Sequence, residues 1–164
     1  MNEAFSLIYI KGMFMLDRTL IGHEFNPYKV DVEKGKIKFF AKAIGEKDPI
    51  YSDLSAAKDA GFKNIPAPPT FAMSLDMESP DFLPVLQLLK MDIARILHGS
   101  QEFEYPGCIY AGDTITVSSK IIDMFDKKNG QLEFVLLEYS YTNQDNELVA
   151  KAVNSLVYRN PKGK

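Results

Sequence analysis

The second half of the chain, from Ile96 onward, carries the residue pattern of β-strands without a break. Polar and apolar residues alternate between Thr114 and Ile121, which predicts a strand with one buried face. The sequence Lys127-Lys128-Asn129-Gly130 predicts a hairpin, because Asn-Gly readily adopts the positive φ angles of a tight turn. We therefore expect this half of the chain to form an antiparallel sheet.

The segments that follow this hairpin predict the middle of that sheet. Residues Leu132–Tyr141 are apolar on both faces, which favours a central strand with a helix on one side. A polar turn at 143–146 then returns the chain along Leu148–Tyr158. Because a strand with two apolar faces needs cover on both, we expect another subunit over part of the sheet, and hence an oligomer, most simply a dimer.

The first half of the chain predicts shorter elements. A short strand is expected over Tyr28–Glu33, and apolar residues then recur with helical spacing from Ile37 to Ile44, directly before a glycine that can end the helix. Ser52 or Asp53 can cap a second short helix, which Gly61 closes.

A proline-rich stretch separates these elements from a strongly apolar run. Pro66-Ala67-Pro68-Pro69 forces an extended approach, and Thr70–Met77 then predicts a buried helix, because proline suits a helix entrance. Helices in the first half and a meander in the second define an α+β fold. We expect a single domain over 17–160, preceded by an N-terminal extension at 1–16.

Composition and charge exclude several classes of function. The 164 residues include 19 Lys and Arg and 22 Asp and Glu, a net charge of −3 without a basic cluster, which argues against a nucleic-acid partner. One cysteine, Cys108, and 2 histidines predict no internal disulfide, no metal site and a reduced, cytoplasmic setting. The segment before Leu16 lacks a signal-peptide cleavage pattern, and no apolar run is long enough to span a membrane.

General catalytic motifs are missing, but four less general patterns occur in order. They are Phe40-Ala41-Lys42-Ala43-Ile44-Gly45-Glu46-Lys47-Asp48-Pro49-Ile50-Tyr51, Ala67-Pro68-Pro69-Thr70-Phe71, Leu97-His98-Gly99-Ser100-Gln101-Glu102-Phe103 and Ala111-Gly112-Asp113-Thr114. In these patterns the chain resembles the MaoC-like hydratases and dehydratases, and more narrowly their N-terminal, FAS1-like type. It is also similar to the mycobacterial (R)-3-hydroxyacyl-ACP dehydratase subunit that pairs with a catalytic partner.

This resemblance implies a fold, a reaction and partners. The fold is the hot-dog fold, in which an antiparallel sheet wraps around a long central helix, and its members work as dimers of like or unlike subunits. The reaction is reversible hydration of an enoyl thioester, carried by coenzyme A or acyl carrier protein, to the (R)-3-hydroxyacyl form. No cofactor is implied, because the thioester itself acidifies the α proton.

The family's usual form, Gly-Asp-x-Asn-Pro-x-His, places an acid and an imidazole five residues apart, where this chain has Glu46 and Tyr51. Adding water to the double bond needs a base for the water and an acid for the α carbon. Glu46 keeps a carboxylate, whereas a phenol, with an unperturbed pKa of about 10, is a poor base. His98 completes the candidate catalytic set. Each residue also has a purely structural interpretation: Glu46 as a carboxylate in a turn, Tyr51 as a packing residue and His98 as a histidine at the end of a strand.

Substrate contacts are expected at the entrance of the central helix. Active relatives present a glycine N–H to the thioester carbonyl there, whereas Pro68 has no N–H to give. The residues that we predict to bind substrate, either as donors or as acyl-chain lining, are Pro69, Thr70, Phe71, Met73 and Gly99. We expect the apolar run that follows this entrance to pack mainly into the core and, secondarily, to line the site of the acyl chain.

Three functions are compatible with these patterns. The first is an acyl-thioester hydratase or dehydratase that acts through Glu46. The second is the non-catalytic, acyl-binding subunit of a heteromeric dehydratase, whose partner supplies an intact Asp and His. The third is a thioesterase, against which the MaoC-like segment counts.

Overall fold

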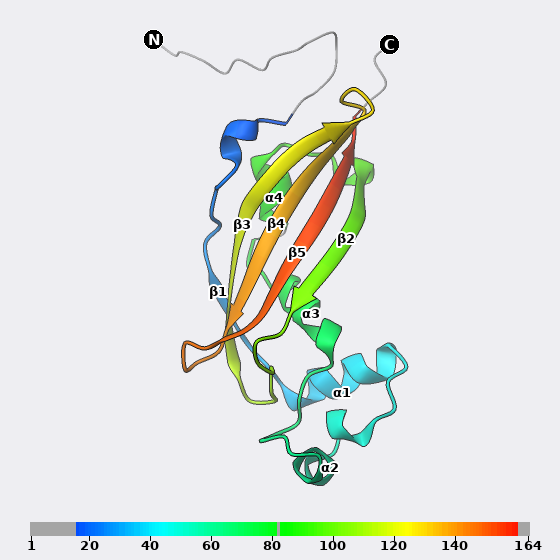
Figure 1. The fold of residues 1–164 in the computed structure, drawn as a ribbon, viewed down its shortest axis with the longest axis vertical. Helices are drawn as coiled ribbons and strands as arrows, with labels where there is room; N and C mark the ends of the chain where they lie inside the picture. The colour runs from blue at the N-terminus through cyan, green and yellow to red at the C-terminus, as the bar shows by residue number, and fades with distance from the viewer. Residues whose placement is uncertain (1–15, 82, 161–164) are drawn as a thin grey trace.

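A computed structural model describes residues 16–81 and 83–160, and the expected extension, apart from Leu16, lies outside the described residues. Its centre is a five-stranded antiparallel sheet in the order β1-β3-β4-β5-β2 (Figure 1). The strands are β1 (Tyr28–Asp31), β2 (Ile96–Glu104), β3 (Thr114–Lys127), β4 (Leu132–Thr142) and β5 (Leu148–Arg159). The prediction that Leu132–Tyr141 forms the central strand is confirmed.

The predicted hairpin and turn connect these strands. Lys128, Asn129 and Gly130 have φ angles of 53°, 52° and 76°, which reverse the chain between β3 and β4. Lys127 then faces Leu132 across the hairpin, so the turn sets the register of these two neighbouring strands. The antiparallel meander is confirmed for β3, β4 and β5, whereas β2 pairs with β5 and not with β3, the next strand along the chain.

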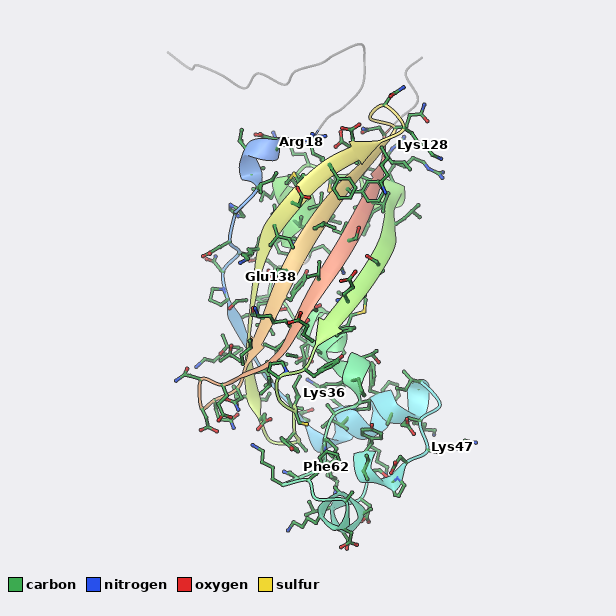
Figure 2. The ribbon with its side chains drawn as sticks, in the orientation of Figure 1. Arg18, Lys36, Lys47, Phe62, Lys128 and Glu138 are labelled. Carbon is green, nitrogen blue, oxygen red and sulfur yellow. The ribbon has the colours of Figure 1, made fainter. Side chains whose placement is uncertain are left out.

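The helical elements are short. The α-helices are α1 (Lys34–Ala43), α2 (Leu54–Asp59), α3 (Ala72–Asp76) and α4 (Pro84–Leu88), and the 3-10 turns are η1 (Arg18–Leu20), η2 (Pro49–Tyr51), η3 (Pro69–Phe71) and η4 (Ile93–Arg95). Of the two predicted caps for α2, Asp53 is the one used, because its carboxylate accepts a hydrogen bond of 2.9 Å from the Ala56 N–H. Figure 1 shows α4 behind the upper part of the sheet and α1 and α2 beyond its lower end, and Figure 2 adds the side chains in the same view.

The expectation of a long central helix is wrong for this chain. The apolar run forms η3 and then the single short helix α3, which ends at Asp76. The first turn, Pro69–Phe71, is a 3-10 turn. Pro80 follows closely, and Leu83 adopts a left-handed φ of 47° before Pro84 starts α4. Two prolines therefore divide the expected helix into separate pieces.

The buried side chains form two clusters on the helix side of the sheet. The α1 cluster includes Ile37, Phe71 and Leu75, and the α4 cluster includes Leu86 and Val135. Tyr139 of β4 packs against both clusters. The core is therefore divided across the middle of the sheet, at the level of Tyr139.

Candidate functional site

Glu46 lies in the exposed loop between α1 and η2. Its Oε1 accepts hydrogen bonds from the N–H groups of Lys47, at 2.7 Å, and Asp48, at 2.9 Å. Asp48 in turn caps η2, because its Oδ1 accepts a hydrogen bond of 3.0 Å from the Ile50 N–H. The Glu46 carboxylate therefore organises its own loop, as expected for a structural turn residue.

Tyr51 is half-buried in η2 and packs on the α1 cluster. Burial raises the pKa of its phenol, and the nearby carboxylates of Glu46 and Asp48 and the thiol of Cys108 raise it further. The structure thus brings the two predicted residues, Glu46 and Tyr51, together. A phenol with a raised pKa stays protonated near neutral pH and can donate a hydrogen bond, but it cannot take a proton from water.

The neighbourhood of Tyr51 includes residues that sequence reasoning did not assign to the site. Cys108 is exposed, and it interacts with the hydroxyl of Tyr110. The Lys63 Nζ lies 4.7 Å from the centre of the Tyr110 ring. Only the tertiary fold brings these residues beside Tyr51, although Cys108 and Tyr110 directly precede the Ala-Gly-Asp-Thr pattern in the sequence.

The predicted helix entrance is built by η3. The Phe71 N–H donates to the Pro68 carbonyl at 2.9 Å, and the Tyr105 hydroxyl donates to the Pro69 carbonyl. The Phe71 N–H is therefore occupied within the turn. Thr70 is exposed, and its N–H makes no backbone hydrogen bond among the described residues outside helices and strands, so it is the candidate donor to a thioester carbonyl at this entrance.

The predicted acyl-lining residues occupy different environments. Phe71 is 1% exposed and its ring meets that of Phe40 edge-to-face, with 5.4 Å between the ring centres. Met73 is 37% exposed, and Pro69 is also exposed. Phe71 is thus core, whereas the other two lie at the surface beside the entrance.

His98 and Gly99 lie near the start of β2, away from Glu46. Figure 1 shows the start of β2 toward the upper end of the sheet and α1 at the lower end of the molecule. The side chain of His98 is exposed. The structure therefore does not bring His98 together with Glu46 and Tyr51.

Gly99 has a steric role that the sequence pattern did not reveal. The register between β2 and β5 shifts between His98 and Ser100, and a Cβ on Gly99 would lie 2.9 Å from Val157 Cγ2 and 3.1 Å from the Ser155 carbonyl. Contacts this short require β5 to move. The glycine thus permits close approach of β2 and β5 at this bulge.

We expect Gly99→Ala to lower the free energy of unfolding by about 1–3 kcal/mol, because the added methyl overpacks the β2–β5 contact. Urea denaturation measures the change. Gly35→Ala is the matched control, since its added methyl would meet no atom within 4 Å, and it should leave stability unchanged or slightly higher. Equal stability of the two variants would contradict this steric role.

A cavity that the sequence analysis did not predict lies between the two core clusters. This α3 cavity has a volume of about 220 Å³ and is bounded by the segment that leads into β1, by the chain after α3 and by the inner faces of β3 and β4. Asp76 and Tyr139 are among its lining residues. The signal in the sequence was a carboxylate, Asp76, inside an otherwise apolar run.

Asp76 is largely buried, and burial raises the pKa of its carboxyl to about 7. The Tyr141 hydroxyl donates to Asp76 Oδ1 at 2.8 Å, which lowers that pKa but does not offset the burial. Burial also raises the pKa of Tyr28 and Tyr139. Asp76 is therefore mostly protonated at mildly acidic pH and about half ionised near pH 7, whereas the buried phenols stay neutral at both.

Among residues 16–81 and 83–160, no group of three or more His, Cys, Asp or Glu side chains is placed to hold a metal ion. No helix in the same ranges is long and apolar enough to cross a membrane.

Comparison with known proteins gives one family. The FAS1-like dehydratase domain region matches residues 19–152. A UPF0336 protein of Saccharopolyspora erythraea is 35% identical over 145 residues, which cover 88% of this chain and 92% of that protein. The match extends over most of both sequences.

Solved structures agree with this result. A C-terminally truncated HadBC (3R-hydroxyacyl-ACP dehydratase) complex from Mycobacterium tuberculosis has a TM-score of 0.72 and 26% identity, covering 84% of this chain and 96% of that one. The ChsH1–ChsH2 complex from the same organism has a TM-score of 0.70 and 22% identity, covering 87% of each chain, and shows likeness of fold alone. The expected hot-dog fold is confirmed, with a short central helix.

Proposed function

The chain belongs to the FAS1-like dehydratase family, and we propose that it is the acyl-binding, non-catalytic subunit of a heteromeric (R)-3-hydroxyacyl-thioester dehydratase. Its partner, a second MaoC-like subunit, supplies the acid and the imidazole. The substrate is a 3-hydroxyacyl or enoyl group on coenzyme A or acyl carrier protein, and the reaction is reversible loss of water. The setting is cytoplasmic fatty-acid metabolism, and no cofactor takes part.

The state of Tyr51 carries this proposal. The residue at the imidazole position is a half-buried phenol whose pKa is raised, beside a Glu46 carboxylate that already accepts two backbone hydrogen bonds. Water addition needs a group that takes a proton near neutral pH and returns it to carbon. This pair lacks such a base, so the proton transfer requires a residue from another chain.

The edge of the sheet supports a second subunit. β2 is an edge strand, and Leu97 on it is 53% exposed, next to Ile93, which is 58% exposed. An unpaired edge with exposed apolar side chains favours pairing with another strand. The HadBC and ChsH1–ChsH2 structures are complexes, and the likeness of this chain to them supports a heteromer here.

The second candidate is a homo-oligomeric hydratase that works through Glu46. The proximity of Glu46 and Tyr51 and the open Thr70 N–H favour it. In that case the Glu46 carboxylate activates water and Thr70 stabilises the thioester oxygen. The two candidates differ in which chain carries the base.

The test compares hydration of an enoyl-CoA by the chain alone, by its partner alone and by the mixture. The partner is a short MaoC-like protein with an intact Gly-Asp-x-Asn-Pro-x-His, sought in the reading frames beside this gene. We expect the chain alone to be inactive, the mixture to be active on long acyl groups, and sedimentation to show a complex of the two.

Substitution of Glu46 separates the candidates. We expect Glu46→Gln in this chain to change the rate of the mixture by no more than about twofold, as does Asp59→Asn, an exposed control at the end of α2. The proposal is wrong if the chain alone hydrates the substrate and Glu46→Gln lowers that rate by about 10²–10⁴-fold, the usual contribution of a general base.

A further inference from the structure

The α3 cavity is a feature that the proposed function does not explain. A pocket that only accepts a hydrocarbon chain is lined by apolar side chains. This one combines Leu137, Val85 and Met77 with the carboxyl of Asp76 and the phenol of Tyr139. Polar groups buried beside apolar ones fix the orientation of a ligand and select its chemistry.

The polar atoms of this wall are only partly used by the protein. The Tyr141 hydroxyl donates to Asp76 Oδ1 at 2.8 Å, and the Tyr28 hydroxyl donates to the Leu75 carbonyl at 3.2 Å. The Tyr139 hydroxyl, in contrast, has no hydrogen-bond partner among the described residues, although it lines the cavity. The second carboxyl oxygen of Asp76 is likewise without such a partner in the described part of the chain.

The polar character continues along the inner face of the sheet. Ser119 is paired with Tyr139 in the register of β3 and β4, and it also lines the cavity. Across β5 and β2, Asn154 faces Gln101, and both carry buried side-chain atoms without a hydrogen bond in the described structure. The two polar pairs lie in different rows of the sheet, because Tyr139 faces Ala152 and Asn154 faces Leu137 across β4 and β5.

The charge state of the cavity selects among polar ligands. Burial is the main cause of the high pKa of Asp76, and it also keeps the tyrosines protonated. His23, Glu24 and Asp81 lie on the same lining. Below about pH 7, Asp76 and the phenols are neutral and match a hydroxyl group, which both donates and accepts hydrogen bonds, better than a hydrocarbon or a carboxylate.

We propose that the α3 cavity binds a hydroxyl group carried on the acyl chain of the ligand, with Tyr139 and Asp76 as its hydrogen-bond partners. This inference rests on the proposed acyl-binding function and names the substrate class within it, acyl chains that carry a hydroxyl at the end far from the thioester. The apolar lining at Leu137, Val85 and Met77 holds the adjoining methylenes.

The test compares two series of acyl-CoA ligands by calorimetry, on the full chain alone and in the complex with its partner. One series is saturated and unsubstituted, and the other carries a hydroxyl on the terminal carbon at each chain length. An apolar tunnel binds the hydroxylated form more weakly, because the hydroxyl loses its water without replacement. The α3 cavity should reverse this preference. At the chain length that places the hydroxyl in the cavity, we expect the hydroxylated ligand to bind about tenfold to a hundredfold more tightly than the unsubstituted one.

Tyr139→Phe supplies the specific control, because it removes the hydroxyl while nearly preserving the volume of the side chain. We expect this variant to lose the preference for the hydroxylated series and to keep its affinity for the unsubstituted one. Tyr110→Phe, a tyrosine outside the cavity lining, should keep the preference.

The outcomes separate this inference from the proposed function. Weaker binding of the hydroxylated form at every length overturns the hydroxyl site and leaves acyl binding intact. Tighter binding of a terminal amine than of the hydroxyl also overturns it, in favour of a cation site. If neither series binds in either setting, the acyl-binding function itself is wrong.

Discussion

Asp76→Asn should stabilise the protein by up to about 4 kcal/mol at pH 8, with little effect near pH 3, because a buried carboxyl with a pKa near 7 is costly to ionise. Asparagine keeps an oxygen at the position that accepts the hydrogen bond from Tyr141, so the change removes the charge and preserves the contact. Denaturation of both proteins across pH measures the difference.

The pH window follows from the direction of the pKa shift. Below about 3.8, the ordinary pKa of this carboxyl, Asp76 is protonated in the folded and the unfolded chain. Between this pH and about 7 the unfolded chain releases its proton while the folded chain retains it, so the wild type loses stability relative to the variant. Above about pH 7 both states are ionised and the difference stays constant.

The groups that interact with the charge of Asp76 come from two strands: Tyr28 of β1, and Tyr139 and Tyr141 of β4. The tyrosines stay neutral throughout this window, so the difference between wild type and variant isolates Asp76. Asp59→Asn, at an exposed position, should change stability by less than about 0.5 kcal/mol. A flat difference for Asp76→Asn as well would mean that its carboxyl is solvated.

Phe71→Ala should lower the free energy of unfolding by about 3–5 kcal/mol, the usual range for a buried aromatic side chain. Phe71 is 1% exposed, contacts Phe40 and belongs to the α1 cluster, so its removal leaves a cavity in the core. Thermal or urea denaturation measures the loss.

Met73→Ala is the control for Phe71 on the same segment. Met73 is 37% exposed, so its truncation should cost less than about 1 kcal/mol. If Phe71 lined an open acyl tunnel, its truncation would cost no more than that of Met73. Comparable losses for the two variants would therefore place Phe71 on the acyl-binding surface.

Local patterns in the sequence were enough to predict the sheet and its connections. Alternation of polar and apolar residues marked β3, and Asn129 and Gly130 marked the turn that places it beside β4. These features depend on the side chains and φ preferences of neighbouring residues, so they can be recognised along the chain.

The length of the central helix depended on a wider context. The apolar run at 70–77 predicted a buried helix and the family resemblance implied a long one, whereas the structure stops α3 at Asp76 and starts α4 at Pro84. Pro80 and Pro84 were visible in the sequence, but an apolar run does not show whether a helix continues past such a break or ends before it. Packing against the sheet decided that point.

The amino-acid order was sufficient for the family, the succession of strands along the chain and the replacement of the expected imidazole by Tyr51. Folding in three dimensions was needed to show that Glu46 bonds its own loop, that Gly99 lies against β5, and that Asp76 and Tyr139 line one cavity. The two groups of features differ in the range of the interactions behind them. Turns and strand patterns arise between neighbours in sequence, whereas desolvation and close contact depend on residues that only folding brings together.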